Sequence, residues 1–447
     1  MIFRKTAACV LLAFAAASVG LAWTGAEGAL GFMKYYLAIG VVGALALAAL
    51  VAGVRGLWKS RSSGCFFAAF PVAAFHLGFA LVLGGWVYNE FAAPEEGYLE
   101  LHAGRAGAVA DAFEFKLADF TIDRWPDTGT VRQYTSRGLV LPPGGTARGL
   151  DGEPVEISVN HPYVKDGWWV YQSSFKEMEN PHTGRPFYFT ILNCVKDVGL
   201  PFVFAGGILL LFGALGYAVQ LLHRTSSGGG GLPETGPYRL CCRLYGLAFL
   251  GAIAMLVHRG LATGHPPMQN MYEFLMCAAV LVPMLTLLSA KLDRQNTLLV
   301  DVVLLSVLLI PVGFPLMDGR IKHLMPALQS PFFVPHVGAY VLGYLLLVRA
   351  ALGAGRRLVG VGYFLLTVGL VLGAAWGKVC WGHWWQFDPK EMWSLATWLV
   401  YAAYFHLKSQ LSPRTERVFL IGGAVMIVLT LTWINLSRIF TGMHSYA

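Results

Sequence analysis

Long apolar runs separated by short polar segments make up most of the chain. Each run approaches the roughly 20 apolar residues that an α-helix needs to cross a bilayer, so the pattern predicts about eleven transmembrane helices. The runs cover residues 7–23, 33–54, 65–87, 200–222, 240–257, 271–288, 298–316, 333–348, 358–376, 392–406 and 418–434. Arg4 and Lys5 before the first run also fit a signal peptide, but the small-residue cleavage candidate lies inside the apolar run, which favours a retained helix.

Basic residues follow every even-numbered run. Arg55 and Lys59 come after the second run, and Arg356 and Arg357 come after the eighth. The opposite segments also carry some basic residues, but the bias keeps one sign along the chain. Because positive charge marks cytoplasmic loops, we expect the N-terminus in the cytoplasm and the C-terminus outside a bacterial cytoplasmic (inner) membrane.

Two segments interrupt the helical pattern. The polar stretch at residues 90–196 contains alternating, aromatic and β-branched runs that predict strands at 113–117, 155–159, 168–171 and 186–191. The second segment, a serine- and glycine-rich run at 226–231, predicts a flexible cytoplasmic linker. The predicted fold is a polytopic α-helical membrane protein with one small β-rich extracytoplasmic domain.

These interruptions divide the chain into five predicted parts. Residues 1–89 hold three transmembrane helices, 90–196 the β-rich domain, 197–223 a fourth helix, 224–238 the linker, and 239–447 a second membrane domain. A tryptophan-rich loop at 376–393 lies in the last part, on the outer side.

Composition narrows the possible function. The chain is 56% hydrophobic and only 13% charged, which excludes an ordinary soluble enzyme. Its net charge of +8 sits mainly on the predicted cytoplasmic loops, so it does not indicate binding of nucleic acid. The seven cysteines form neither C-x-x-C nor C-x-x-C-H, which excludes a thioredoxin-like carrier and a c-type cytochrome.

The densest aromatic cluster lies between the ninth and tenth runs. Tryptophans favour membrane interfaces, so an aromatic belt is one interpretation. A belt does not explain why fixed charges stand among the rings, whereas a large planar ligand with anionic edges, such as a porphyrin, needs both. The candidate ligand-binding residues are Trp381, Trp384, Trp385, Phe387, Asp388 and Lys390.

Four histidines form a second pattern. His76 and His406 lie within or toward the cytoplasmic end of predicted helices, and His336 and His444 lie at outer ends. Each alone is more often structural, but two pairs suit a bis-histidine haem iron. Other histidines near the outer face leave the pairing open. A b-type cytochrome commonly places two ligands on one helix, and no predicted helix here carries two histidines.

The sequence from Trp381 to His406, WGHWWQFDPKEMWSLATWLVYAAYFH, resembles the tryptophan-rich WWD signature of haem-handling proteins, in its CcsA (ResC) branch. The segments LQSPFFVPH at 328–336, GMHSYA at 442–447 and MQNMYE at 268–273 resemble the same branch. The front half, with VNHP at 159–162 and YQSSF at 171–175, resembles CcsB (ResB). The whole chain resembles a fused CcsBA-type cytochrome c synthase of System II, with Phe387 in place of a usual tryptophan.

The resemblance implies a function and a site. It implies export of haem b and its covalent attachment to the C-x-x-C-H cysteines of apocytochrome c outside. His76 and His406 would bind the haem iron inside the bundle, and His336 and His444 would bind it at the outer surface. Lys378, Lys390 or Arg438 could pair with the propionates. The implied partners are apocytochrome c, haem, thiol-reducing pathway proteins and membrane lipid, with no nucleic acid.

Two alternatives remain open at this point. One is a haem exporter or chaperone without ligation activity, and the other is a b-type cytochrome membrane subunit.

Overall fold

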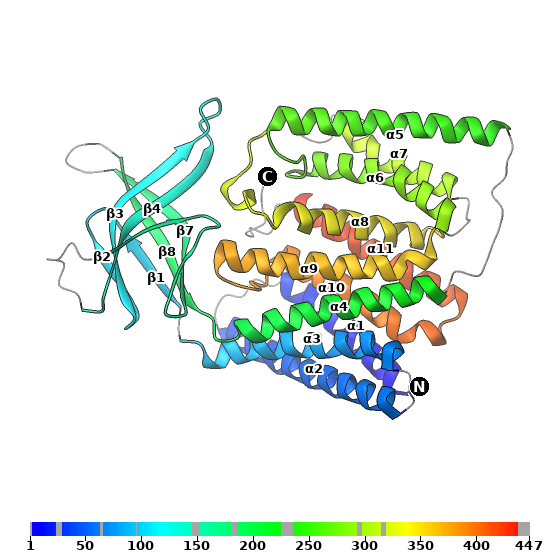
Figure 1. Cartoon of the computed structure of the whole chain (residues 1–447), viewed down its shortest axis with the longest axis horizontal. Coiled ribbons are helices and arrows are strands. Elements are labelled where there is room, and N and C mark those ends of the chain that lie inside the picture. The colour runs from blue at the N-terminus through cyan, green and yellow to red at the C-terminus, as the bar shows by residue number, and fades with distance from the viewer. Residues whose placement is uncertain are drawn as a thin grey trace.

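The computed structural model describes the backbone of residues 2–23, 29–62, 66–94, 96–144, 152–179, 184, 186–224, 236–292, 297–313 and 319–436, and side chains in most of these. Within these ranges the helices lie side by side, and a β domain stands at one end of them (Figure 1). The glycine-rich linker, His444 and Arg438 lie outside the described residues.

The described residues form eleven α-helices, and seven of these are long and apolar enough to cross a membrane: α3 (Phe66–Ala92), α4 (Leu200–Arg224), α5 (Gly236–Thr263), α6 (Met271–Leu292), α8 (Phe333–Ala351), α9 (Val359–Trp381) and α11 (Pro413–Leu436). The protein is therefore a multi-pass membrane protein.

The predicted count of eleven transmembrane helices is supported only in part. The apolar stretches described in α1 (Ile2–Trp23), α2 (Ala29–Ser62) and α7 (Leu298–Gly313) are shorter than a full span. Helix α10 (Pro389–Leu407) is neither among the seven long apolar helices nor among the three with shorter apolar stretches. Lys390, Glu391 and several tyrosines lower its hydropathy. Whether these four helices cross the bilayer remains a prediction.

The β domain consists of two four-stranded antiparallel sheets that share one core. One sheet has the order β1 (Gly97–Leu101), β8 (Pro186–Lys196), β7 (Trp168–Glu179), β6 (Tyr163–Lys165). The other has the order β2 (Ala106–Val109), β3 (Phe113–Arg124), β4 (Val131–Leu141), β5 (Glu153–Ser158). The four predicted strands lie in β3, β5, β7 and β8, and the other four strands were not predicted.

Both sheets bury apolar residues from alternate strand positions. Phe113, Phe115, Ile157 and Leu192 lie in the core with at most 1% of their surface exposed. Inside this core Gln172 accepts a hydrogen bond from Ser136 Oγ at 2.6 Å. This buried polar contact joins β4 to β7, and so fixes one sheet on the other.

The helices form two modules that interlock: the N-terminal module, α1–α4, and the C-terminal module, α5–α11. Within the first, Gly78 of α3 lies so close to α4 that an added Cβ would stand 2.4 Å from Leu210 N. Between the modules, Ala8, Leu11 and Ala15 of α1 are buried in the core that α8–α11 form, and α1 packs along α10.

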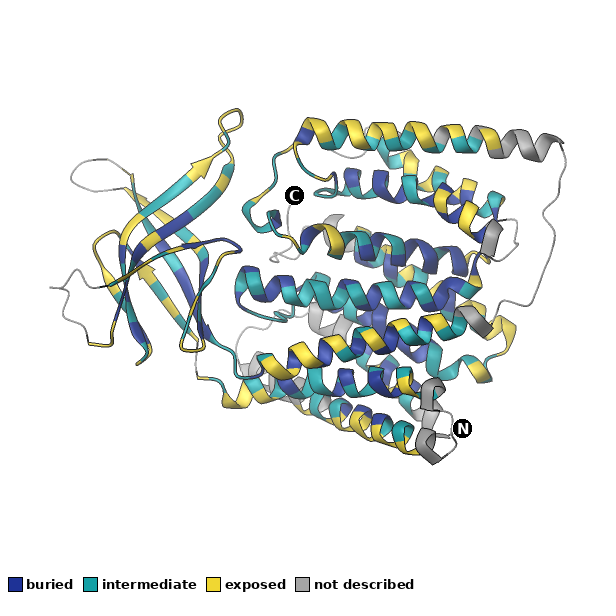
Figure 2. Ribbon diagram, in the orientation of Figure 1, coloured by how far each residue is buried: buried dark blue, intermediate teal, exposed yellow. Residues whose placement is uncertain are grey.

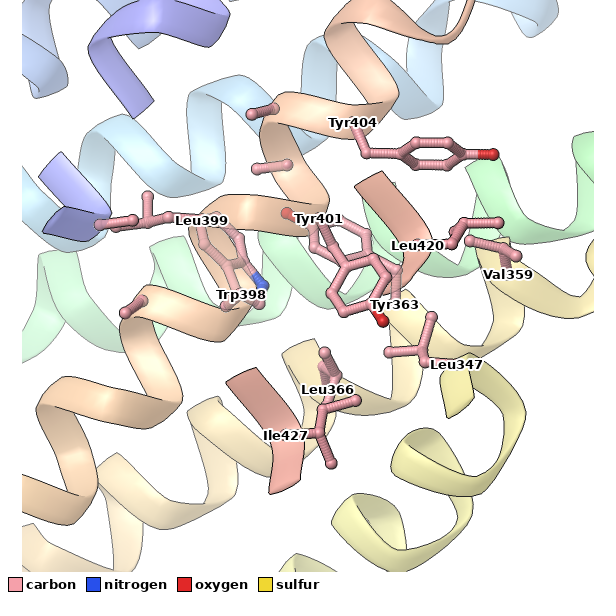
Figure 3. Close-up of a cluster of buried hydrophobic side chains, with 14 of the residues drawn as sticks. Leu347, Val359, Tyr363, Leu366, Trp398, Leu399, Tyr401, Tyr404, Leu420 and Ile427 are labelled. Atoms are coloured by element: carbon pink, nitrogen blue, oxygen red, sulfur yellow. The ribbon is translucent and has the colours of Figure 1, made fainter. Parts of the chain in front are cut away.

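That shared core is rich in aromatic residues. Tyr363, Trp398, Tyr401 and Tyr404 of α9 and α10 meet aliphatic residues of α8, α9 and α11 there (Figure 3). Figure 2 shows that buried residues gather on the central helices, whereas α5 at the edge is largely exposed. Among the described residues, the largest buried cluster of the membrane region is therefore formed by α8–α11 together with α1 of the other module.

Candidate functional site

His76 of α3 and His406 of α10 face each other across the boundary between the two modules. Their ring centres lie 5.9 Å apart, and the ring planes make an angle of 79°. Two imidazoles that each bind one metal at about 2 Å have ring centres about 6 Å apart. The pair, called the inner pair below, therefore has a ring spacing compatible with one shared metal ion, a spacing that edge-on ring packing also gives.

The hydrogen bonds of the inner pair select the tautomer that can bind a metal. His76 Nδ1 donates to the carbonyl of Val72 at 2.7 Å, and His406 Nδ1 donates to the carbonyl of Ala402 at 2.8 Å. A carbonyl only accepts, so the proton lies on Nδ1 and the lone pair lies on Nε2. Such an outer partner is typical of a histidine that ligates a metal.

A cluster of aromatic rings adjoins the inner pair through Phe75, whose ring packs edge-on against His76 at 6.1 Å between ring centres. Trp398 of α10 stacks with Phe75 at 5.9 Å, with Phe79 at 5.3 Å and with Tyr363 at 5.5 Å between ring centres. Its indole Nε1 donates to Thr367 Oγ1 at 3.0 Å, which fixes the ring. The side chains around the pair thus offer stacking surfaces to a large planar ligand.

The same two helices also meet near the tryptophan-rich segment. Trp86 of α3 packs its ring edge-on against Phe387, which stands just before α10, at 5.9 Å between ring centres. Aromatic residues therefore line the boundary between α3 and α10 from the inner pair to that segment. We call this boundary, made by Phe75, Phe79, Trp86, Phe387 and Trp398, the aromatic seam.

His336 lies in the first turn of α8, close to α9. Its Nδ1 donates to the carbonyl of Gly369 at 2.9 Å, which again places the lone pair on Nε2. Gly373 admits the ring, because a Cβ there would stand 2.6 Å from His336 Cε1. The ring also packs against Tyr340 at 5.0 Å and Trp376 at 5.6 Å. The pairing of His336 with His444 stays a prediction, because His444 lies outside the described residues.

The tryptophan-rich segment is mostly helical. Trp376 and Trp381 belong to the last turns of α9, and α10 begins at Pro389, so the connection covers residues 382–388 and is shorter than the predicted loop 376–393. Gly382 ends α9 with a positive φ of 93°. A glycine at this position ends a helix readily, because it adopts the left-handed conformation without a Cβ clash.

The aromatic residues of this segment do not share one surface. Trp381 stacks on Trp376 at 6.1 Å, on the side of His336. Trp385 and Phe387 instead pack with Met392 and Trp393 at the start of α10. The structure therefore brings Trp381 near His336, and it brings Phe387 near the seam, but it does not gather all the candidate rings around one point.

Trp384 and Lys378 point toward the β domain. Trp384 Nε1 donates to Asp197 Oδ2 at 2.7 Å, and Lys378 Nζ lies 3.0 Å from the same oxygen. Lys378 also donates to the carbonyl of Gly382 at 3.0 Å, and no more than 4% of either charged side chain is exposed. Lys378 was a candidate for a propionate, and here its charge is balanced by Asp197, which follows β8.

His383 joins the same contact region. Its Nδ1 lies 3.2 Å from Glu96 Oε1, and its Nε2 lies 3.4 Å from Asn193 Nδ2 on β8. Burial lowers the pKa of His383, although the neighbouring Glu96 acts to raise it. The histidine of the tryptophan-rich segment is thus a contact to the β domain.

Asp388 and Glu391 organise the start of α10. Asp388 Oδ1 accepts from the backbone N–H of Lys390 at 2.8 Å, and Glu391 Oε2 accepts from the N–H of Asp388 at 3.2 Å. This is a capping box, and Pro389 at the first helical position completes it. The D-P-K-E sequence carried that signal, but sequence reasoning assigned its charges to the ligand.

Phe387, directly before this cap, has a positive φ of 58°, which is rare for an aromatic residue. Strained backbone of this kind persists where surrounding contacts impose it, and it is common at functional sites.

The M-Q-N-M-Y-E segment, at residues 268–273, is hydrogen-bonded to the connection between α7 and α8. Glu273 accepts from Arg259 Nε and from the N–H of Gln269, each at 2.9 Å. Arg259 also donates to the carbonyl of Gly319 at 2.9 Å, and Gln269 Nε2 donates to that of His323 at 3.0 Å. Sequence reasoning noted the segment but not this role, because the partners lie about 50 residues away.

This geometry defines a class: a multi-pass membrane protein with metal-competent imidazoles and flat aromatic surfaces between two helical modules. Comparisons with known proteins specify the class. Residues 67–186 match the model of the ResB-like family, and residues 354–444 match the model described as Cytochrome C assembly protein.

Individual relatives agree with the second match. The Cytochrome c biogenesis protein CcsA of Prochlorococcus marinus (strain MIT 9303) is 27% identical over 319 residues, which cover 58% of this chain and 98% of the relative. The CcsA of Synechococcus sp. (strain RCC307) is 27% identical over 294 residues, or 53% and 93% of the two chains. That of Chlamydomonas reinhardtii is 28% identical over 239 residues, or 45% and 67%.

Together these matches support a fused CcsBA-type arrangement of System II cytochrome c biogenesis, in which a ResB-like region precedes a CcsA-like region. The same matches support a role in haem handling for cytochrome c maturation.

Proposed function

We propose that the protein takes up haem b in the membrane, moves it outward, and joins it to the C-x-x-C-H cysteines of apocytochrome c. The observation that carries this proposal is the inner pair. His76 and His406 come from different modules, stand at the spacing of two axial ligands, and keep their lone pairs on Nε2. A purely structural pair has no need for all three properties.

The inner pair and the seam would handle haem in sequence. His76 and His406 would hold the iron from both sides, and two axial nitrogens keep oxygen from the metal. The rings of Phe79 and Trp398 would stack on the porphyrin. Stacking surfaces also continue toward Phe387, so the ligand would leave along the seam without losing contact with flat apolar groups.

His336 and His444 would hold the haem at the outer surface. Trp381, Trp384, Trp385 and Phe387 would surround the ring there, and Asp388 and Lys390 would set its polar edge. In thioether formation a cysteine S–H adds across a vinyl C=C: an S–C bond and a C–H bond form, and the S–H bond and the π bond break. No electron acceptor is needed, and the protein contributes proximity and orientation.

Sidedness and domain limits belong to the same proposal. The N-terminus and the linker at 224–238 would lie in the cytoplasm of a bacterium. The β domain, the tryptophan-rich segment and the C-terminus would lie outside the cytoplasmic membrane. The basic residues that follow alternate apolar runs support this arrangement. An apocytochrome histidine would finally replace one outer ligand and release the product.

Expression of this chain with an apocytochrome, in a host without its own maturation proteins, tests the proposal. Covalent holocytochrome, together with a low-spin haem spectrum of the purified chain, is the expected result. Haem binding without covalent product would identify an exporter or chaperone. A stoichiometric haem that stays bound and is reversibly reduced would identify a b-type cytochrome subunit.

A further inference from the structure

Asn160 is a β-domain residue that reaches into the C-terminal module. It stands in the turn between β5 and β6, and only 8% of its surface is exposed. Its amide Nδ2 lies within hydrogen-bond distance of three carbonyl oxygens, those of Pro326 at 2.9 Å, Ala327 at 3.3 Å and Gln329 at 3.1 Å. One side chain therefore gathers the carbonyls of the short 3-10 turn that precedes α8.

The same turn is bonded to the outer histidine site. Trp376 Nε1 donates to the carbonyl of Ala327 at 3.2 Å, so Asn160 and Trp376 share that oxygen. The Trp376 ring packs against His336 at 5.6 Å. Val159, the neighbour of Asn160, is buried in one cluster with Leu328 and Trp376. Direct contacts thus run from Asn160 through Ala327 and Trp376 to His336.

The backbone of Asn160 adopts a conformation that by itself favours glycine. Its φ is +67°, a conformation that glycine adopts most easily and asparagine tolerates better than most residues. Glycine would relieve the backbone but would supply no donor to the three carbonyls. In the V-N-H-P segment His161 is exposed, Val159 supplies apolar packing, and Asn160 supplies the polar contact with the C-terminal module.

Other contacts in this region cannot replace the asparagine. Gln329 Nε2 donates to the carbonyl of Arg132 at 2.8 Å, and the His323 ring stacks on Trp125 at 4.2 Å. Both tie the same connection to the β3–β4 hairpin. Neither reaches the Ala327 carbonyl that Trp376 uses, so among the hydrogen bonds of the described residues it is Asn160 that ties the β domain to this oxygen, beside the apolar packing of Val159 in the same cluster.

We infer that Asn160 is a positioning residue of the outer haem site: through Ala327 and Trp376, the β domain sets where the His336 imidazole stands. The inference rests on the proposed function, because it assumes that His336 binds haem. It assigns the β domain a part in building the site. Loss of an outer partner of a metal ligand commonly costs about 10–100-fold in affinity or activity.

The test uses the full chain with Asn160→Gly, which keeps the positive φ and removes only the docking side chain. Asp166→Gly is the matched control: Asp166 is an exposed turn residue of the same domain with a φ of +52°. His336→Gly is the reference for loss of the outer ligand. The measurements are the haem absorption spectrum, holocytochrome yield, and both again with free imidazole.

The expected result is that Asn160→Gly lowers holocytochrome yield about tenfold and alters the haem spectrum. Added imidazole should restore part of both, because a displaced His336 leaves a coordination position that imidazole can occupy. Asp166→Gly should match the parent. Asn160→Asp, which places a carboxylate against three carbonyls, should be at least as defective as Asn160→Gly.

Two outcomes overturn different claims. If His336→Gly leaves the spectrum and the yield unchanged, the outer haem site itself is wrong. If His336→Gly is defective but Asn160→Gly equals Asp166→Gly in spectrum, yield and response to imidazole, Asn160 is only a structural turn residue. A loss in Asn160→Gly that imidazole does not restore would also refute the positioning role.

Discussion

The N-terminal half of the chain meets the C-terminal half at two places that differ in kind. In the membrane, α3 meets α10 through the aromatic seam, where Trp398 stacks with Phe75 and Phe79. Outside the helices, the β domain meets α9 and the connection before α8 through directed contacts. The buried ion pair of Lys378 with Asp197 and the contacts of the Asn160 amide with three carbonyls make this outer junction.

The two junctions respond differently to an incoming ligand. Ring stacking is worth about 0.5–1.5 kcal/mol for each pair and depends weakly on identity, so a porphyrin can replace one ring on the face of another at small cost. A buried ion pair is different, because removing one partner leaves an uncompensated charge. The comparison teaches that the aromatic seam can admit a planar ligand transiently, whereas the outer junction holds the β domain in a fixed position against the helices.

Breaking the ion pair of the outer junction should have the largest effect. In Lys378→Met, Asp197 stays buried without its cation, and we expect a loss of about 3–5 kcal/mol of stability. The double variant Lys378→Met with Asp197→Leu should recover most of it. Thermal unfolding of the detergent-purified protein measures this loss.

A matched ion pair on the surface serves as the control. In Lys176→Met, the exposed pair of Lys176 with Glu100 is lost, and we expect a change below about 1 kcal/mol. Equal unfolding temperatures for Lys378→Met and Lys176→Met would show that the buried pair does not hold the junction.

Removal of either inner histidine should mainly change haem binding. In His76→Gly and in His406→Gly, co-purifying haem should fall roughly 10–100-fold, because one ligand of the iron disappears. Free imidazole should restore part of it in both variants, while His161→Gly in the β domain should behave as the parent. Haem content and visible spectra give the result, and normal haem in both variants would make the pair structural.

Removal of the central ring of the seam should have a smaller effect. Trp398→Leu should lower co-purifying haem about two- to tenfold, because one stacking partner of the porphyrin is lost. Thr367→Val keeps the ring and removes its hydrogen-bond acceptor, so it should cost about 1 kcal/mol of stability with haem content unchanged. The idea of a stacking route fails if the two variants retain the same amount of haem.

Acidification should produce the smallest change in stability, through the hydrogen bond between Asp127 and His323 at the edge of the outer junction. A hydrogen bond from His323, at 2.6 Å, lowers the pKa of the exposed Asp127 carboxyl below its ordinary value of 3.8. The folded state thus favours the carboxylate. Its stabilisation is present above pH 3.8 and is lost as the pH falls through the lower folded value.

The acid effect can be measured as a difference between two proteins. The difference in unfolding temperature between the parent and Asp127→Asn should be small at neutral pH, should begin to fall as the pH approaches 3.8, and should vanish below the lower pKa of the folded state. A difference that stays constant down to low pH would mean that the carboxylate charge contributes nothing.

Sequence periodicity was enough to predict the helices and part of the β domain. The strand at 113–117 is apolar at every second position, and it became β3. Strand β4 was missed because Arg132, Gln133 and Gly138 break its apolar alternation. Gly138 is required there because a Cβ would stand 2.3 Å from the Lys116 carbonyl, and sequence alone does not show this close approach.

For the candidate site, sequence reasoning named residue types but gave little of their arrangement. The depths of His76 and His406 in their helices predicted two histidines toward the cytoplasmic side, and the structure places their rings together. Asp388 could have been interpreted as a helix cap from the glutamate three residues later. Asn160 could not have been found, because its partners lie more than 160 residues away and are backbone carbonyls that carry no sequence signal.

The packing of α1 against α10 has a consequence for biosynthesis. Ala8, Leu11 and Ala15 reach their final environment only after α10, which begins at Pro389, has been made. At about 5–20 residues per second, the first helix waits on the order of tens of seconds in the membrane before its partner exists. The small side chains on this face give the unpaired helix little apolar surface for non-native contacts. Because α1 packs on α10, the first module is complete only after the second has been translated.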